Sequence, residues 1–334
     1  MTTSARVRVE SAQALRDIQA PVRERLDEVA AEMWRLVADD LPLVQDVSQH
    51  LMAMKGKMFR PTLVLLASMT DGRGERRATL MGAVAELIHL ATLVHDDAVD
   101  HSVLRRGMPT VNALYSHQVS IIFGDFLYSR ALLSLVKDRD LESLRIFATA
   151  SNELSLGEIR QLAAIDALAF SETDYDALIR AKTASLFRAA CEVGALCGAQ
   201  RHLAALSRFG ERLGMAFQVA DDLLDYTEEQ ATIGKPSGLD LKEHKVTLPL
   251  IAALRRMSPA ARQRVEALFS SPQAQDSDIA EVIALVGDAG GIEYARRRGD
   301  EFAEEAEEAL AGLPESSART ALSDTIAYVM DRRW

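Results

Sequence analysis

Cysteines are scarce in this chain, and aromatic residues are few. Cys191 and Cys197 are the two cysteines among 334 residues, and aromatic residues make up 5%. Their spacing in an apolar stretch forms neither a disulfide framework nor a CxxC metal or redox pair, so we interpret them as small buried side chains. This composition predicts a reducing, cytoplasmic setting.

A basic tract and a long apolar run are also missing. The formal net charge is −11, which argues against nucleic-acid binding through phosphate neutralisation. The most apolar stretch, residues 80–94, is too short to cross a membrane and contains Glu86 and His89. The N-terminus lacks the apolar segment of a secretory signal. We therefore expect no transmembrane segment and no nucleic-acid partner.

Helical periodicity is what the sequence does show. Residues 80–100, 174–199 and 206–229 are rich in alanine and leucine and contain no proline. Thr173 and Asp176 are spaced as a capping box before the second of these segments. The turn-forming stretches between the periodic segments are too short to be interdomain linkers. These features predict a single all-helical domain over residues 1–334.

An acidic motif, DDxxD, interrupts this pattern twice. Its two copies are Asp96, Asp97 and Asp100, and Asp221, Asp222 and Asp225. Positions i, i+1 and i+4 of a helix place three carboxylates on one side of one turn. A solvated acidic face would need no apolar flanks, whereas both copies follow apolar helical segments. Carboxylates without histidine or cysteine ligands suit Mg²⁺, which binds carboxylates together with substrate phosphates.

Cationic residues occur in compact groups around the two motifs. They are Lys55, Lys57 and Arg60; Arg105 and Arg106; Lys182; and Lys235, Lys242 and Lys245. Arginine and lysine are the side chains that bind phosphate. Each group alone could be ordinary surface charge, but together with two DDxxD motifs they indicate a site for a magnesium-bound diphosphate.

The motifs resemble those of the trans-type (E-type) polyprenyl diphosphate synthases, in particular long-chain types such as octaprenyl and heptaprenyl diphosphate synthases. The resemblance covers roughly residues 50–250. It rests on "GKMFRPTLVLLA", "LIHLATLVHDDAVDHSVLRRGMPTVN", "GDFLYSRA", "AKTASLF" and "FQVADDLLDYTEEQATIGKPSGLDLKEHKVTLPLI", in that order. It implies a bundle of mostly antiparallel helices around a deep central cavity. It also implies that isopentenyl diphosphate is condensed onto an allylic diphosphate, farnesyl or geranylgeranyl, in a homodimer.

The resemblance also assigns roles to individual residues. The metal ligands would be Asp96, Asp97, Asp100, Asp221, Asp222 and Asp225, holding about three Mg²⁺ ions. The catalytic set would be Asp96, Asp97, Asp100, Lys182, Asp221 and Asp222. Isopentenyl diphosphate would contact Gly56, Lys57, Arg60, His89 and Arg106. The allylic diphosphate would contact Arg105, Lys182, Lys235 and Lys245, with Thr183 and Gln218 completing the substrate site. One departure is His244, where the family usually has glycine, so the loop there is expected to take another shape.

Product length is the least constrained property. Bulky side chains four and five residues before the first motif shorten the products of this family, whereas Ala91 and Thr92 are small. This predicts a long product, from hexaprenyl to decaprenyl, with Phe126 as a candidate floor of the tunnel. An equally good interpretation is that Phe126 only packs in the hydrophobic core. The alternatives are a farnesyl or geranylgeranyl diphosphate synthase, a class I terpene cyclase, and a non-catalytic helical metal-binding protein.

Overall fold

The protein is all-α, as the periodicity predicts. The computed structural model describes residues 13–54, 56–72, 74–163, 167–227, 238–271 and 274–331. Its helices are η1 (Ala20–Val22), α2 (Arg23–Val37), α3 (Pro42–Ala53), α4 (Phe59–Met69), α5 (Arg77–Val99), α6 (Val111–Leu114), α7 (His117–Asp138), α8 (Leu141–Ala163), η2 (Ala167–Ala169), α9 (Glu172–Ile179), η3 (Arg180–Ala184), α10 (Ser185–Leu196), η4 (Gln200–His202), α11 (Leu203–Thr227), α13 (Leu239–Lys242), α14 (Leu248–Leu254), α15 (Pro259–Ser270), α16 (Asp276–Asp288), α17 (Gly291–Leu310) and α18 (Ser317–Met330).

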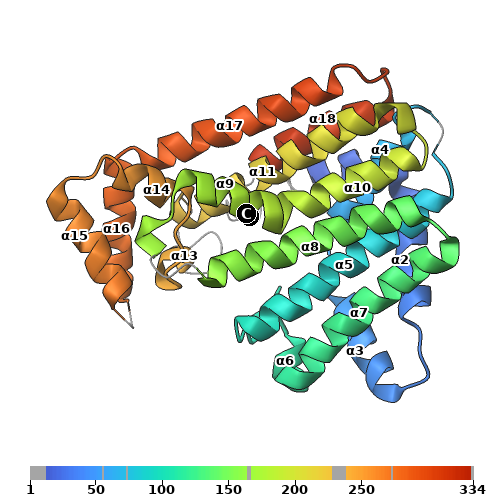
Figure 1. The fold of residues 1–334 in the computed structure, drawn as a ribbon, viewed down its shortest axis with the longest axis horizontal. Helices are drawn as coiled ribbons and strands as arrows, with labels where there is room; N and C mark the ends of the chain where they lie inside the picture. Colours follow the sequence, from blue (N-terminus) through green and yellow to red (C-terminus); the bar gives the residue numbers. More distant parts are fainter. Residues whose placement is uncertain are drawn as a thin grey trace.

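The long helices form a bundle, and α5 is one of its buried helices. Figure 1 shows α5, α7, α8, α10, α11 and α17 running alongside one another, with α15 and α16 at one end. Every residue from Met81 to Ile88 of α5 is buried. A helix that is apolar on all sides lies in the core of a large protein. The last turn of α5 therefore presents its polar residues from a fixed support.

A second, smaller core lies where α13, α14, α15 and α16 pack together. Tyr226 at the end of α11 belongs to this core, with Leu241, Leu250 and Val282. The end of α11 is therefore held from both sides, by the main bundle and by this group. That places the second DDxxD motif on a supported helix end, as the first one is.

A two-residue hairpin is the strand structure found among the described residues. Strand β1 (Leu104–Arg105) pairs antiparallel with β2 (Met108–Pro109). Arg106 and Gly107 between them both have positive φ, 53° and 77°. Two central residues of positive φ are the signature of a type I′ turn, which joins strands tightly. The hairpin holds Arg105 and Arg106 directly beside the end of α5.

Two local expectations from the sequence are wrong. The capping box at the start of α9 is formed by Ser171 and Asp174, not by Thr173 and Asp176. Both pairs satisfy the same spacing, and Asp176 instead pairs with Arg298 of α17, 3.1 Å away. The helix predicted over residues 174–199 is also interrupted by η3, a π-helical turn. Such turns are frequent at functional sites.

Candidate active site

The first carboxylate cluster stands at the end of α5. Asp96 is half-buried, Asp97 is buried at 6% exposure and Asp100 is exposed. Both oxygens of Asp97 accept hydrogen bonds from Nε of Arg105, at 2.9 and 2.8 Å. Asp97 is thus committed to the hairpin arginine, and Asp96 and Asp100 form the open edge of the cluster.

The second cluster stands near the end of α11 and is joined to other elements by hydrogen bonds. Asp222 is 6% exposed. Its oxygens accept from the Tyr175 hydroxyl at 2.6 Å and from Nε2 of Gln218 at 2.8 Å. The Thr183 hydroxyl donates to Oε1 of Gln218 at 2.6 Å. Asp222 is therefore oriented by α9 and, through Gln218, by the π-helical turn.

Asp225, the last member of the second motif, binds backbone. Its carboxylate accepts from the N–H groups of Leu239 and Asp240, both at 2.9 Å, and its carbonyl accepts from Gly238. A carboxylate in this position caps the N-terminus of a helix, here α13. Asp225 therefore stabilises the start of α13. Its role as a metal ligand stays a prediction.

A cavity of about 730 Å³ lies between the two clusters. Its lining includes Asp100, Asp221, Asp222, Asp225 and Asp240, the cations Lys182 and Lys245, and Glu158, Thr183 and Gln218. Apolar side chains, among them Phe170, Leu178 and Ile179, line the remainder. The structure therefore brings members of both acidic motifs to the same cavity, as the sequence predicts.

Burial and neighbouring carboxylates raise the pKa values of two aspartates at this site, Asp96 and Asp240. Burial, opposed by Lys182 and assisted by Glu158 and Asp100, raises the pKa of Asp96 to about 6. Burial, assisted first by Asp225, raises the pKa of Asp240 to about 7. Crowded carboxylates with raised pKa values are typical of functional sites, where a bound cation would restore the balance.

These residues fit Mg²⁺ shared with a substrate. Within the described ranges, no group of three or more Asp, Glu, His or Cys side chains is close enough to hold a metal ion by itself. Mg²⁺ is commonly held by one or two carboxylates, with waters and substrate phosphates as its other ligands. The donor set is all oxygen, which Mg²⁺ prefers. Two separated clusters facing one cavity match a metal that arrives with a diphosphate.

The two cations at this cavity are paired with carboxylates. Nζ of Lys182 lies 2.6 Å from Glu158 of α8, and Nζ of Lys245 lies 2.6 Å from Glu243. Burial alone would lower the pKa of Lys245, but Glu243, Asp100 and Asp240 outweigh it and raise that pKa. Lys245 therefore stays charged at neutral pH, and both lysines are near enough to the cavity to bind phosphate.

His244 shows that the loop before Lys245 keeps a glycine-like shape. The φ of His244 is +56°, in the left-handed region that glycine adopts without strain. Its ring stacks on Phe269, with centroids 5.4 Å apart. His244 thus adopts the backbone conformation that a glycine would adopt here, and the stacking of its ring on Phe269 stabilises it. The structure therefore gives no reason to expect a different loop shape.

A second group of cations gathers beside α5, around Glu86. Arg106 donates to the carbonyl of Met54 at 3.1 Å, and Arg60 stacks over the ring of Phe187 at 5.0 Å. Glu86 is 5% exposed; burial raises its pKa, and Arg60 and Arg106 oppose that shift. The buried carboxylate thus lies among the cations predicted to bind isopentenyl diphosphate.

His89 lies among the same cations. Burial, with Arg60, Arg106 and Arg105 acting in the same direction, lowers its pKa well below the ordinary value. His89 is therefore a neutral imidazole at pH 7. A neutral imidazole can donate one hydrogen bond to a phosphate oxygen without bringing further positive charge.

Of the residues that the structure describes, the remaining predicted ones are not found among those that line the 730 Å³ cavity. Lys57 is exposed and lies 5.9 Å from the ring centroid of Tyr328. Lys235 lies outside the described residues. Ala91 is 3% exposed and Phe126 is half-buried against Phe123, with ring centroids 5.4 Å apart. Ala91, Thr92 and Phe126 do not line the 730 Å³ cavity as far as the described residues define it, so their role in chain length stays a prediction.

Several residues of the site were missed from the sequence. They are Glu86, Glu158, Tyr175 and Asp240. Tyr175 lies two helical turns before Lys182, and Glu86 lies one turn before His89. Those spacings are the signals that could have pointed to them.

Comparison with known proteins identifies the family. Residues 41–286 match the family described as polyprenyl synthetase, so the chain belongs to it. Its members are prenyltransferases, and this chain elongates prenyl diphosphates. It is 38% identical over 318 residues to the geranyl-diphosphate-specific all-trans-nonaprenyl-diphosphate synthase of Rhodobacter capsulatus, covering 95% of this chain and 97% of that one.

One further related sequence and one related crystal structure are similar over most of this chain. A short chain isoprenyl diphosphate synthase from Methanothermobacter thermautotrophicus is 34% identical over 291 residues, 85% of this chain and 89% of that protein. The crystal structure of a Caulobacter crescentus polyprenyl synthase, complexed with calcium and isoprenyl diphosphate, superposes with a TM-score of 0.89 at 32% identity, covering 96% and 98% of the two chains. Relatives named for long and for short products are thus similarly related, and product length needs its own evidence.

Proposed function

We propose that this chain adds isopentenyl diphosphate repeatedly, by 1′-4 trans condensation, to an allylic diphosphate such as farnesyl or geranylgeranyl diphosphate, using Mg²⁺. The observation that carries the proposal is the pair of acidic helix ends facing one cavity, with a separate group of cations beside α5. The neighbour from Caulobacter crescentus, with calcium and isoprenyl diphosphate bound, supports a divalent cation and this ligand class. We further infer a single domain and a cytoplasmic location.

The arrangement suits a reaction through an allylic cation. The C–O bond of the allylic diphosphate breaks, and its electron pair leaves with the diphosphate. Mg²⁺, when bound, neutralises the charge that develops on this leaving group. Lys182 and Lys245, which line the same cavity, would hold this diphosphate. The double bond of isopentenyl diphosphate then attacks the allylic carbon, and the proton lost from the new bond passes to the departed diphosphate, so no protein base is required.

The second group of cations would hold isopentenyl diphosphate. Arg60 and Arg106 supply permanent positive charge, and His89 supplies a neutral donor. Glu86 would offset the repulsion between the guanidiniums of Arg60 and Arg106 when no phosphate is bound, because its carboxylate carries the opposite charge. The apolar side chains in part of the cavity lining would shield the allylic cation from water, which would otherwise capture it.

Replacing Gly56 tests this second subsite. A Cβ at this position would lie 3.2 Å from both Nη1 of Arg106 and Oε1 of Glu86. We expect Gly56→Ala to displace these groups and to raise KM for isopentenyl diphosphate by about tenfold, with kcat changed far less. Initial rates at varied isopentenyl diphosphate measure this. Gly312→Ala, which meets no atom within 4 Å, is the control; equal KM values in the two variants would contradict the placement.

Turnover is the direct test of the proposed reaction. Purified protein is incubated with isopentenyl diphosphate and one allylic diphosphate at a time, with Mg²⁺ or with excess EDTA. We expect labelled isopentenyl units in an organic-soluble product only when Mg²⁺ is present. A cyclic hydrocarbon formed from the allylic diphosphate alone would favour a terpene cyclase, and no product with any starter would refute the proposal for the single chain.

An apolar stripe on α7 supports a homodimer. Ile122, Leu133 and Val136 are 67%, 44% and 54% exposed and follow a heptad-like spacing with Phe126 and Ser129. By length and composition, α5 and α7 could each cross a membrane, but the apolar window of α5 is 61% buried in the bundle and that of α7 is 39% buried. We propose that a second copy of this chain, rather than lipid, covers the exposed face of α7.

Charge on this stripe should separate the copies. We expect Ile122→Glu with Leu133→Glu to halve the mass of the native protein in sedimentation equilibrium, because buried unpaired carboxylates disfavour association. Leu43→Glu, at a residue of similar exposure on α3, should leave the mass unchanged. A wild-type protein that sediments as a monomer would contradict the dimer.

A further inference from the structure

Tyr175 connects a helix outside the two acidic motifs to one motif carboxylate. It is 1% exposed, and its hydroxyl lies 2.6 Å from Oδ2 of Asp222. With Gln218 on Oδ1 at 2.8 Å, each oxygen of Asp222 receives one donor. These two bonds fix the orientation of the carboxylate and leave each oxygen a further lone pair for a cation.

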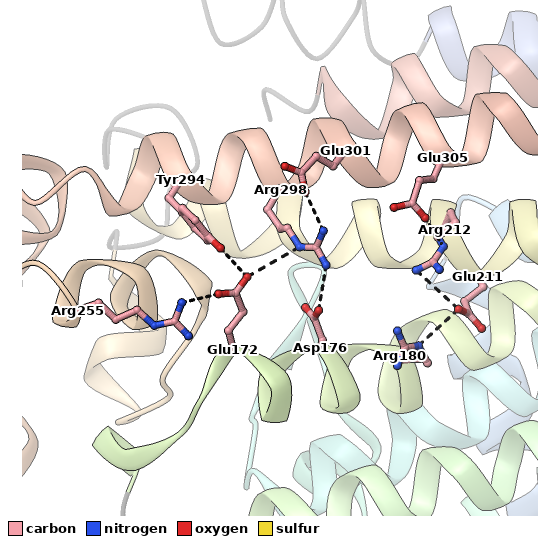
Figure 2. A network of polar contacts seen from close by, with 10 residues as sticks. All are labelled: Glu172, Asp176, Arg180, Glu211, Arg212, Arg255, Tyr294, Arg298, Glu301 and Glu305. Atoms are coloured by element: carbon pink, nitrogen blue, oxygen red, sulfur yellow. Dashed lines mark hydrogen bonds and ion pairs between the residues drawn. The ribbon is translucent and has the colours of Figure 1, made fainter.

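Tyr175 lies on α9, a short helix that ion pairs connect to the end of α14 and to α17. Arg298 of α17 contacts Asp176 at 3.1 Å and Glu172 at 3.9 Å. Glu172 also pairs with Arg255, at the end of α14, at 2.7 Å and accepts the Tyr294 hydroxyl at 2.7 Å. Figure 2 shows these side chains converging on α9 from the neighbouring helices.

The same network continues to the π-helical turn that carries Lys182. Arg180 in η3 lies 3.5 Å from Glu211 of α11, and Glu211 is also 3.9 Å from Arg212, which pairs with Glu305 of α17 at 2.8 Å (Figure 2). The outer face of α9 and η3 is therefore tied to α11 and α17 by charge. Their inner face carries Tyr175 and Thr183, which lead to Asp222.

We propose that Tyr175 is a positioning residue for the metal site, and that the Arg298 ion pairs hold α9 so that its hydroxyl meets Asp222. The inference rests on the proposed function, because it assigns Asp222 to a metal-binding cluster. Groups that orient a ligand carboxylate commonly change metal affinity about tenfold or more when removed. Tyr175 also lines the cavity, but its hydroxyl is turned to Asp222, so we assign it a role through that carboxylate.

A pair of tyrosine variants separates this role from simple packing. Tyr175→Phe and Tyr226→Phe each remove one buried hydroxyl and keep the ring. Tyr226 is 5% exposed, and its hydroxyl accepts a hydrogen bond from Thr247 at 3.4 Å. Isothermal titration of Mg²⁺ into protein with inorganic diphosphate gives the apparent dissociation constant without any turnover.

We expect Tyr175→Phe to raise this constant about tenfold and Tyr226→Phe to change it less than about twofold. Equal constants in the two variants would overturn the proposal. Wild-type protein that binds no Mg²⁺ with diphosphate would overturn both this inference and the proposed function, so the two failures are distinguishable. Thermal unfolding, followed in parallel, shows whether either variant is simply unfolded.

The outer ion pairs have their own matched test. Asp176 and Glu301 contact the same guanidinium, Asp176 from α9 and Glu301 from α17 itself at 2.8 Å. We expect Asp176→Asn to weaken Mg²⁺ binding in the same direction as Tyr175→Phe, and Glu301→Gln to leave it unchanged. Identical behaviour of Asp176→Asn and Glu301→Gln would overturn the role of Arg298.

Discussion

We expect Asp96→Asn and Asp221→Asn each to lower kcat by about a thousandfold, and Asp225→Asn to have a much smaller effect. The reason is that the aspartates of the two motifs have different surroundings. Asp96 and Asp221 stand at the open edges of their clusters, and Asp221 lines the cavity. Asp225 gives both its oxygens to the backbone of α13. Removing a charge that faces the developing diphosphate anion costs far more than weakening a helix cap.

The measurement is kcat at saturating Mg²⁺ and substrates, with the unfolding temperature as a control. Asp225→Asn removes one charge from the same motif, so it is a matched control for the loss of charge alone. It should lower the unfolding temperature by a few degrees, because loss of a cap costs about 1 kcal/mol. Equal losses of kcat in all three variants would show that the hydrogen bonds of Asp225 do not separate it from the other two.

We expect Thr92→Phe to shorten the product by several isoprene units. Thr92 lies one helical turn before Asp96 on the same side of α5, about 6 Å closer to the helix start. It is half-buried, and its hydroxyl bonds only to the carbonyl of His89 among the contacts described, at 2.8 Å. A phenyl ring there would stand beneath the first acidic cluster, where a growing chain must pass. Mass spectrometry of the products measures the change.

Ala91→Phe should act in the same direction but at a cost in stability. Ala91 is buried in the main core, and inserting a large side chain into a packed core costs about 1–3 kcal/mol. Ala31→Phe, on the exposed side of α2, is the control for an added phenyl ring. An unchanged product from a folded Thr92→Phe enzyme would show that the chain does not grow along this side of α5.

The sequence predicts the parts of the site that repeat a local spacing. The acidic motifs fall on helix ends because DDxxD follows an apolar helical period, and Arg105 and Arg106 fall in a tight turn because glycine and proline follow them. The capping box was misplaced because Ser171 and Asp174 share the same spacing with Thr173 and Asp176. Local rules cannot decide between two pairs that satisfy them equally.

Contacts between distant residues could not be read from the sequence. Tyr175 and Asp222 are 47 positions apart, and their bond depends on how α9 packs against α11. The motif predicts Asp225 as a third ligand, whereas in the fold its carboxylate accepts from the N–H groups of Leu239 and Asp240 of α13. The pairing of Lys182 with Glu158 likewise requires η3 to lie against α8. These partners show that Asp97 binds an arginine and that Asp225 binds backbone N–H groups, which the motif alone cannot do.

The most direct test of long-chain synthesis is the product distribution of the wild-type protein. The purified chain is incubated with Mg²⁺, farnesyl diphosphate and excess isopentenyl diphosphate, and product lengths are read by mass spectrometry. We predict a ladder that ends in one polyprenyl diphosphate longer than geranylgeranyl. A product that stops after a single addition would keep the reaction but contradict the open path beneath Asp96 that the small side chains Ala91 and Thr92 predict.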